Sequence, residues 1–149
     1  MLKDSITIKG DLRILVQDSV SGCLKEDKFV NNLVVTTGKE LIASRLSSAS
    51  NSVITHMAIG TNSTTAQSSD TTLVAELVRQ AVTTSGGVVT ANTVQFECVY
   101  AAGVGTGSIQ EAGLFNANSS GMMLARTTFP VINKGATDIM TIYWTITIG

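Results

Sequence analysis

Apolar and polar side chains alternate without a break in the stretch Thr141-Ile142-Tyr143-Trp144-Thr145-Ile146-Thr147-Ile148. Trp144 and three isoleucines therefore share one face of an extended chain, and Tyr143 and three threonines share the other. A period of two sustained over this length predicts a half-buried β-strand. We expect Trp144 to anchor the core from this strand, because burying its ring removes a large apolar area from water.

Similar strand patterns run upstream of this stretch, separated by short clusters of turn residues. They occupy residues 5–20, 29–35, 53–60, 78–84 and 88–100, followed by two more between Ile109 and the C-terminal strand. Residues 78–84 and 88–100 are predicted to form a hairpin through Ser85-Gly86-Gly87. Eight or nine short strands at this spacing favour an all-β, jelly-roll-like β-sandwich. Residues 1–149 are expected to form a single domain of this type.

One segment, at about residues 37–46, has the pattern of a short α-helix instead. Thr37 and Glu40 have the spacing of a capping box, in which each side chain bonds to the backbone of the other residue. Leu41, Ile42 and Leu46 follow on one helical stripe, which is expected to face the core.

The composition restricts the classes of partner. Only 14% of the residues are charged, against roughly 25% in an ordinary soluble domain, and the net charge is −1. A basic stripe for nucleic acid, an apolar membrane span and a signal peptide are all missing from the sequence, so we expect neither a nucleic-acid nor a membrane partner. A surface so poor in charge suits either a protein covered by neighbouring subunits or simply a threonine-rich β-protein.

Potential catalytic and metal-binding residues are isolated from one another. His56 is the only histidine and lacks companion ligands, so a core or interface role is the expectation. The glycines of residues 103–107 do not match a nucleotide-binding loop, since a strand pattern follows them. Cys98 lies in a strand pattern and is expected to be a buried thiol, with a Cys23–Cys98 bridge as the less favoured alternative. We therefore predict no enzyme activity, no catalytic, cofactor-binding or metal-binding residue, and no cofactor.

Two opposite charges, Glu111 and Arg126, interrupt otherwise apolar strand patterns on consecutive strands. They can form a cross-strand pair if the strands are neighbours, which would let them be partly buried. The alternative is two separate side chains exposed at the rim of the sheet.

Three blocks of sequence resemble small structural proteins of tailed-bacteriophage virions. The blocks are residues 32–46, then residues 56–61 with 70–73 and 76–77, and finally residues 111–116 and 123–130 with the terminal strand. Within that group the best match is to capsid cement, or decoration, proteins. The resemblance implies a protein made in the host bacterial cytoplasm that binds the capsid exterior and stabilises contacts between major capsid subunits, as a homo-oligomeric dimer or trimer.

A second reading of the same resemblance is a tail-fibre or neck-appendage module involved in host attachment. Such a module is expected to show exposed aromatic residues for stacking on sugars, and aromatic residues make up only 5% of the chain. For the capsid reading, the contacts are expected in an N-terminal arm at about residues 1–8 and in the loop of residues 61–70.

Overall fold

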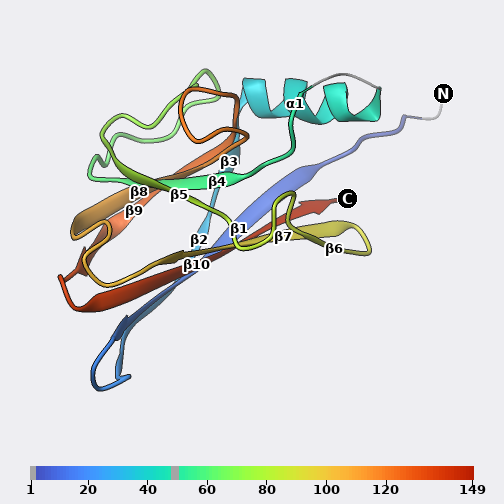
Figure 1. Ribbon diagram of the computed structural model, residues 1–149. Helices are drawn as coiled ribbons and strands as arrows, with labels where there is room; N and C mark the ends of the chain where they lie inside the picture. Colours follow the sequence, from blue (N-terminus) through green and yellow to red (C-terminus); the bar gives the residue numbers. More distant parts are fainter. Residues whose placement is uncertain (1–2, 48–50) are drawn as a thin grey trace.

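The protein is a sandwich of two antiparallel β-sheets, each of five strands, in a computed structural model that describes residues 3–47 and 51–149 (Figure 1). One sheet has the strand order β2-β1-β10-β7-β6 and the other β3-β9-β8-β4-β5. The elements are β1 Ile8–Asp18, β2 Leu24–Asn31, β3 Leu33–Val34, α1 Thr36–Leu46, β4 His56–Gly60, β5 Glu76–Ala81, β6 Val88–Thr90, β7 Thr93–Tyr100, β8 Gly107–Phe115, β9 Met123–Lys134 and β10 Asp138–Ile148. The predicted all-β sandwich with a short helix is confirmed.

The alternating C-terminal stretch forms β10, the central strand of its sheet. β10 pairs with β1 on one side and with β7 on the other, which places Trp144 between Leu12 and Phe96. Trp144 is fully buried, as predicted, and its indole Nε1 donates a hydrogen bond of 3.1 Å to Asn32 Oδ1. Ile148 was expected on the same buried face but is 42% exposed, because the strand runs past the end of the core there.

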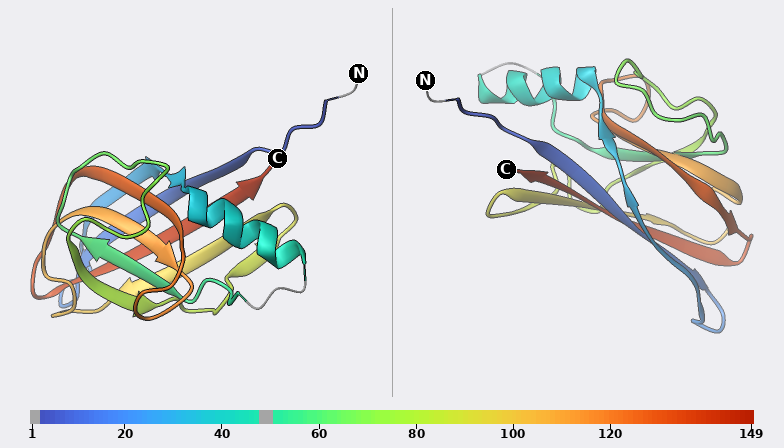
Figure 2. Two further views of the ribbon diagram at one scale, coloured as in Figure 1. Left: turned by 90° about the horizontal axis from the view of Figure 1, so that it is seen from above. Right: turned by 180° about the vertical axis from the view of Figure 1, so that it is seen from behind.

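The N-terminal strand pattern, expected at residues 5–20, forms an inner strand of its sheet. β1 begins at Ile8 and is flanked by β10 and β2, so most of its backbone is already paired. Residues 3–7 project from the body as an arm, held at Thr7 by reciprocal backbone hydrogen bonds with Gly149 (Figure 2). Met1 and Leu2 of the predicted arm lie outside the described residues.

The predicted hairpin of residues 78–84 and 88–100 is wrong, because these strands belong to different sheets. β5 pairs with β4, whereas β6 and β7 form a hairpin in the opposite sheet. Its turn passes through Ala91, which adopts a positive φ of 53° without glycine. Gly86 and Gly87, which have φ values of 80° and 71°, instead carry the chain from one sheet to the other.

Helix α1 lies at the end of the sandwich where both termini emerge (Figures 1 and 2). The predicted capping box does not form, since the helix begins one residue earlier and the Thr37 hydroxyl donates to the Met123 carbonyl at 2.8 Å. Gly38 brings the helix against β9 so closely that an added Cβ would lie 2.0 Å from the Leu124 carbonyl oxygen. Leu41 is buried as predicted, whereas Leu46 is 88% exposed because it lies beyond the edge of the sheets.

Candidate functional site

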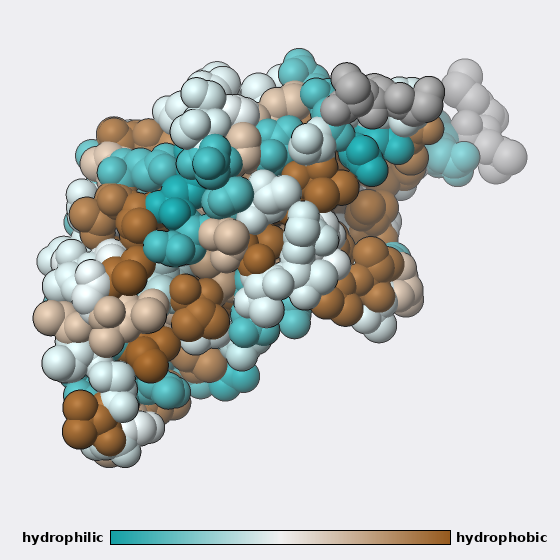
Figure 3. Space-filling model, viewed as in Figure 1, coloured by the Kyte–Doolittle hydropathy of each residue, from teal (hydrophilic) through white to brown (hydrophobic). Residues whose placement is uncertain are grey.

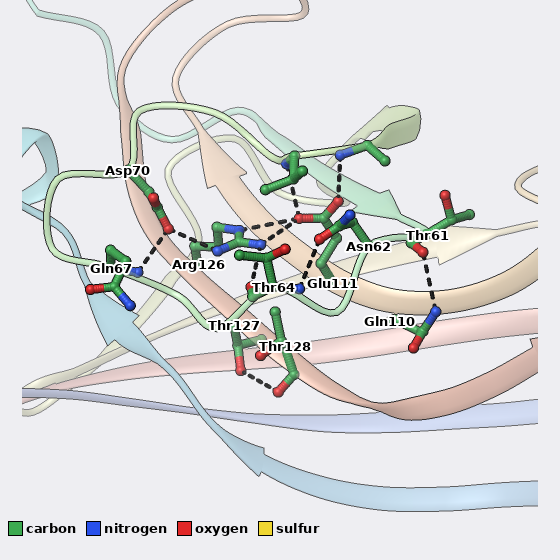
Figure 4. Close-up of polar contacts among 12 residues, drawn as sticks. Thr61, Asn62, Thr64, Gln67, Asp70, Gln110, Glu111, Arg126, Thr127 and Thr128 are labelled. Carbon is green, nitrogen blue, oxygen red and sulfur yellow. Dashed lines mark hydrogen bonds and ion pairs between the residues drawn. The ribbon is translucent and has the colours of Figure 1, made fainter.

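Arg126 is the centre of a polar network buried on the outer face of the β3-β9-β8-β4-β5 sheet (Figure 4). Its Nε and Nη2 atoms donate to Glu111 Oε2 at 3.1 and 2.9 Å. Nη1 donates to Asp70 Oδ2 at 2.8 Å, and Nη2 also donates to the Thr64 carbonyl at 2.8 Å. One guanidinium group on β9 therefore joins a carboxylate of β8 to a carboxylate and a carbonyl of the loop that connects β4 and β5.

Glu111 completes the network from the neighbouring strand. Its Oε1 accepts a hydrogen bond of 2.7 Å from the Ala75 amide, and Oε2 accepts one of 3.1 Å from the Val74 amide. Glu111 and Arg126 are both completely buried. A buried charge is tolerated when it is paired and its remaining hydrogen-bonding capacity is used, and both conditions hold for this pair.

The strand register explains why these two side chains meet. Gly113 of β8 lies opposite Arg126 of β9, and Glu111 lies opposite Thr128, so Glu111 and Arg126 are diagonal neighbours on one face. Diagonal positions lie within reach of long side chains. The structure therefore brings together the pair that the sequence suggested and excludes two separate exposed charges.

The network holds the loop of residues 61–75, which connects β4 and β5, against the outer face of the sheet. The backbone comes close enough that a Cβ added at Gly60 would lie 2.4 Å from the Ala75 carbonyl oxygen. Leu73 packs beneath the loop in a small buried cluster with Ala58, Phe115, Met123 and Val35. Most residues of the loop are exposed. The loop is nevertheless held on the sheet by the buried polar network and by the packing of Leu73.

The arrangement is structural in character. Both Glu111 and Arg126 are sealed from solvent, so neither can reach a substrate. Within residues 3–47 and 51–149, no group of three or more His, Cys, Asp or Glu residues is placed to hold a metal ion. His56 is half-buried, with Nδ1 at 2.8 Å from the Thr55 hydroxyl, and burial together with the nearby Arg79 charge lowers its pKa.

The two cysteines are separate free thiols, so the disulfide alternative is wrong. Cys23 is exposed, whereas Cys98 lies in the core, where burial raises the pKa of its thiol to about 11. The segment of residues 103–107 joins β7 to β8, in agreement with its prediction as a strand connection.

An apolar groove of about 310 Å³ lies between α1 and the β6–β7 hairpin. Its outer walls include Ile42 and Leu46 of the helix, with Val53 and Val89 opposite. Figure 3 shows hydrophobic surface gathered in this region of the molecule. Leu46 and Val89 are 88% and 71% exposed, so a large apolar area here faces solvent in the isolated chain.

Sequence reasoning missed Asp70 and Thr64 as members of the buried network. Both lie in a segment of serine, threonine and asparagine that has the composition of an ordinary surface loop. Asp70 is 56 residues away from Arg126 in sequence, and no local pattern indicates such a contact. In the described part of the chain, the helix is too short to cross a membrane.

Comparison with known families assigns this sandwich to a class of virion proteins. The family described as phage tail-collar fibre protein, N-terminal, matches residues 26–146, which run from β2 into β10 and include the buried network. No curated protein and no solved structure matches the chain. The matched family is structural and consists of phage virion components. The chain belongs to the family of phage tail-collar fibre proteins, of which it carries the N-terminal domain.

Proposed function

We propose that this domain is a tail-fibre or neck-appendage module that helps to attach a phage to its host. The observation that carries the proposal is the family match, which spans strands of both sheets and not one local motif. The description of the family refers to the N-terminal part of fibres at the tail collar. In that role the domain would join a fibre to the virion.

The architecture supports a mechanical role of this kind. The loop of residues 61–75 is tied to the sheet by ionic and backbone contacts instead of being left mobile. The core runs through both sheets, and the central strand β10 is paired along most of its length on both sides. Such a rigid module can transmit force without local unfolding.

We also propose that the domain works as a homo-oligomer, either a dimer or a trimer. The exposed apolar groove beside α1 supports this, because large exposed apolar patches commonly mark association surfaces. Size-exclusion chromatography with light scattering tests the proposal. Leu46→Lys is expected to shift the mass toward the monomer, and Leu24→Lys, at another exposed leucine, serves as the matched control.

The capsid cement reading is the competing proposal, and it would place the protein against major capsid subunits on the outside of the shell. The family match favours the appendage reading over it. Immunogold labelling of intact virions separates the two. Label confined to the collar, tail or fibres supports the appendage function, and label spread over the capsid surface overturns it.

A further inference from the structure

The N-terminal part of β1 has an unpaired edge. β10 pairs with β1 along its whole length, whereas β2 pairs with it only from Asp11 onward. At that point the chain leaves for the opposite sheet, and the Asn32 amide makes a last hydrogen bond of 3.0 Å to the Gly10 carbonyl. Along residues 3–9, the side that faces away from β10 therefore has no neighbouring strand in the described part of the chain (Figure 2). We call this side the arm edge.

The backbone groups of Ile6 and Ile8 point to the arm edge. Successive residues of a strand direct their N–H and C=O groups to alternate sides. Thr7 exchanges both of its backbone hydrogen bonds with the residue that follows β10, so Thr7 faces β10. The amide of Ile148, which lies opposite Ile8, donates instead to the Asn92 carbonyl at 2.9 Å, away from β1. The N–H and C=O groups of Ile6 and Ile8 are thus turned outward, as at sheet edges that accept an added strand.

An apolar hollow of about 550 Å³ lies between the arm and helix α1. Its walls include Ile6 and Ile8 of the arm and Lys39, Ile42 and Leu46 of the helix. Ile6 is 77% exposed in the isolated chain, and Leu46 is also open to solvent. A strand added at the arm edge would present its own inward-facing side chains to the same side of the sheet as this hollow.

We propose that the arm edge pairs with the arm edge of a second copy of this chain, in an antiparallel arrangement with two-fold symmetry centred on Ile6. Such pairing rests on the homo-oligomer proposed above and commits it to a dimer. Opposite residues of an antiparallel pair direct their backbone groups to the partner together, so the even-numbered residues pair with one another. With Ile6 opposite Ile6, Ile8 lies opposite Asp4, and Lys9 lies opposite Lys3.

The length and charge of the arm favour a second copy as the occupant. Pairing residues 3–9 of one copy with residues 9–3 of the other uses the arm edge up to the point where β2 closes it. The Asp4 carboxylate of the second copy then lies opposite Ile8, which lines the hollow together with the exposed Lys39. Symmetry repeats this approach of opposite charges at the other end of the pair. Ile6 of both copies is removed from water, and the two sheets become continuous.

The first test is sedimentation of the unaltered chain over a range of about 10 µM to 1 mM. We expect a dimer with a dissociation constant on the order of 10–100 µM, because the paired segment is short. Ile6→Pro removes the N–H of the central pair in each copy and should weaken the dimer about tenfold or more. Ser5→Pro is the matched control, because its missing N–H points away from the arm edge, and it should change the constant by less than about twofold. Thermal unfolding verifies that both variants remain folded.

Two further variants test the register. Lys9→Glu should tighten the dimer severalfold, because it replaces the unfavourable pair of Lys9 and Lys3 with opposite charges. In a Cys23→Ser background, Ile6→Cys should form a disulfide between copies in a glutathione buffer, because Cα atoms of a hydrogen-bonded antiparallel pair lie about 5.5 Å apart. Ser5→Cys should form far less of it, because the two Ser5 positions are offset by two residues.

Several results would overturn the arm pairing. A chain that stays monomeric at 1 mM overturns it together with the proposed homo-oligomer. An oligomer that Ile6→Pro leaves unchanged, or that crosslinks equally at positions 5 and 6, overturns the arm pairing alone and leaves the groove beside α1 as the interface. A mass of three chains also overturns the two-fold arrangement. Labelling of intact virions tests the appendage function separately, so the failure of one proposal is distinguishable from the failure of the other.

Discussion

The buried pair of Glu111 and Arg126 allows a quantitative test of how the loop of residues 61–75 is held. Arg126→Ala removes the guanidinium group and leaves the fully buried Glu111 carboxylate with only two backbone amides as partners. Breaking a buried ion pair from one side typically costs about 3–5 kcal/mol of unfolding free energy. We expect Arg126→Ala to fall in this range.

Glu111→Ala should cost less, about 2–3 kcal/mol, because two effects partly offset each other. The amides of Val74 and Ala75 lose their acceptor, which destabilises the anchored loop. Arg126, however, keeps the Asp70 carboxylate at 2.8 Å and the Thr64 carbonyl, so its charge stays compensated. The structure thus predicts an asymmetry between the two single variants.

The assay is urea unfolding followed by tryptophan fluorescence, with Trp144 as the natural probe. The double variant Glu111→Ala, Arg126→Ala closes the cycle and should be destabilised by at least about 1 kcal/mol less than the sum of the single variants. Glu26→Ala, which removes an exposed ion pair with Lys28 at 3.5 Å, is the control and should change stability by less than about 0.5 kcal/mol. Additive single effects, or a larger cost for Glu111→Ala than for Arg126→Ala, would refute the reasoning.

Three further predictions concern the core, the thiols and acid stability. Trp144→Ala should destabilise the fold by roughly 3–5 kcal/mol in the same urea assay, and a loss below about 1 kcal/mol would contradict its place in the core. In the native protein iodoacetamide should label only Cys23, because Cys98 is buried and the pKa of its thiol is raised to about 11. Mass spectrometry of the peptides measures the labelling, and in urea both cysteines should react. In the folded state, a hydrogen bond from Lys25 and another from the Gly135 amide lower the pKa of Asp138 below its ordinary 3.8. The Asp138 carboxylate therefore stabilises the fold above pH 3.8, and this contribution is lost as the pH falls through the folded pKa. Between about pH 5 and pH 2, the melting temperature should therefore fall less for Asp138→Asn than for the unaltered protein. Equal falls in melting temperature would contradict the assignment.

The sequence predicted those features of the fold that depend on local periodicity. Strict alternation identified β10 and the burial of Trp144, since burial on one face of a strand needs only a period of two. The predicted start of the helix, at about residue 37, differs by one residue from the observed start at Thr36. Its capping box failed because the Thr37 hydroxyl found a tertiary partner, the Met123 carbonyl, that no local rule includes.

Features that depend on how the strands assemble could not be predicted in the same way. Gly86 and Gly87 have the composition of a hairpin turn, but the flanking strands pair in different sheets. The actual β6–β7 turn passes through Ala91, which carries no turn signal. Asp70 belongs to the buried network only because the loop folds back over β8 and β9.

The placement of β10 between β1 and β7 has a consequence for how the domain folds during synthesis. Ile8 pairs with Ile148, so the sheet of β1 closes only through contacts spanning nearly the whole domain. Until β10 has emerged from the ribosome, the buried faces of β1 and β7 lack the strand that joins them. Folding of this sheet should therefore wait for the synthesis of β10 and be slow, as is usual for topologies of high contact order. Nascent chains that stop short of Asp138 would expose two unpaired strand edges, which makes them natural substrates for chaperones and proteases.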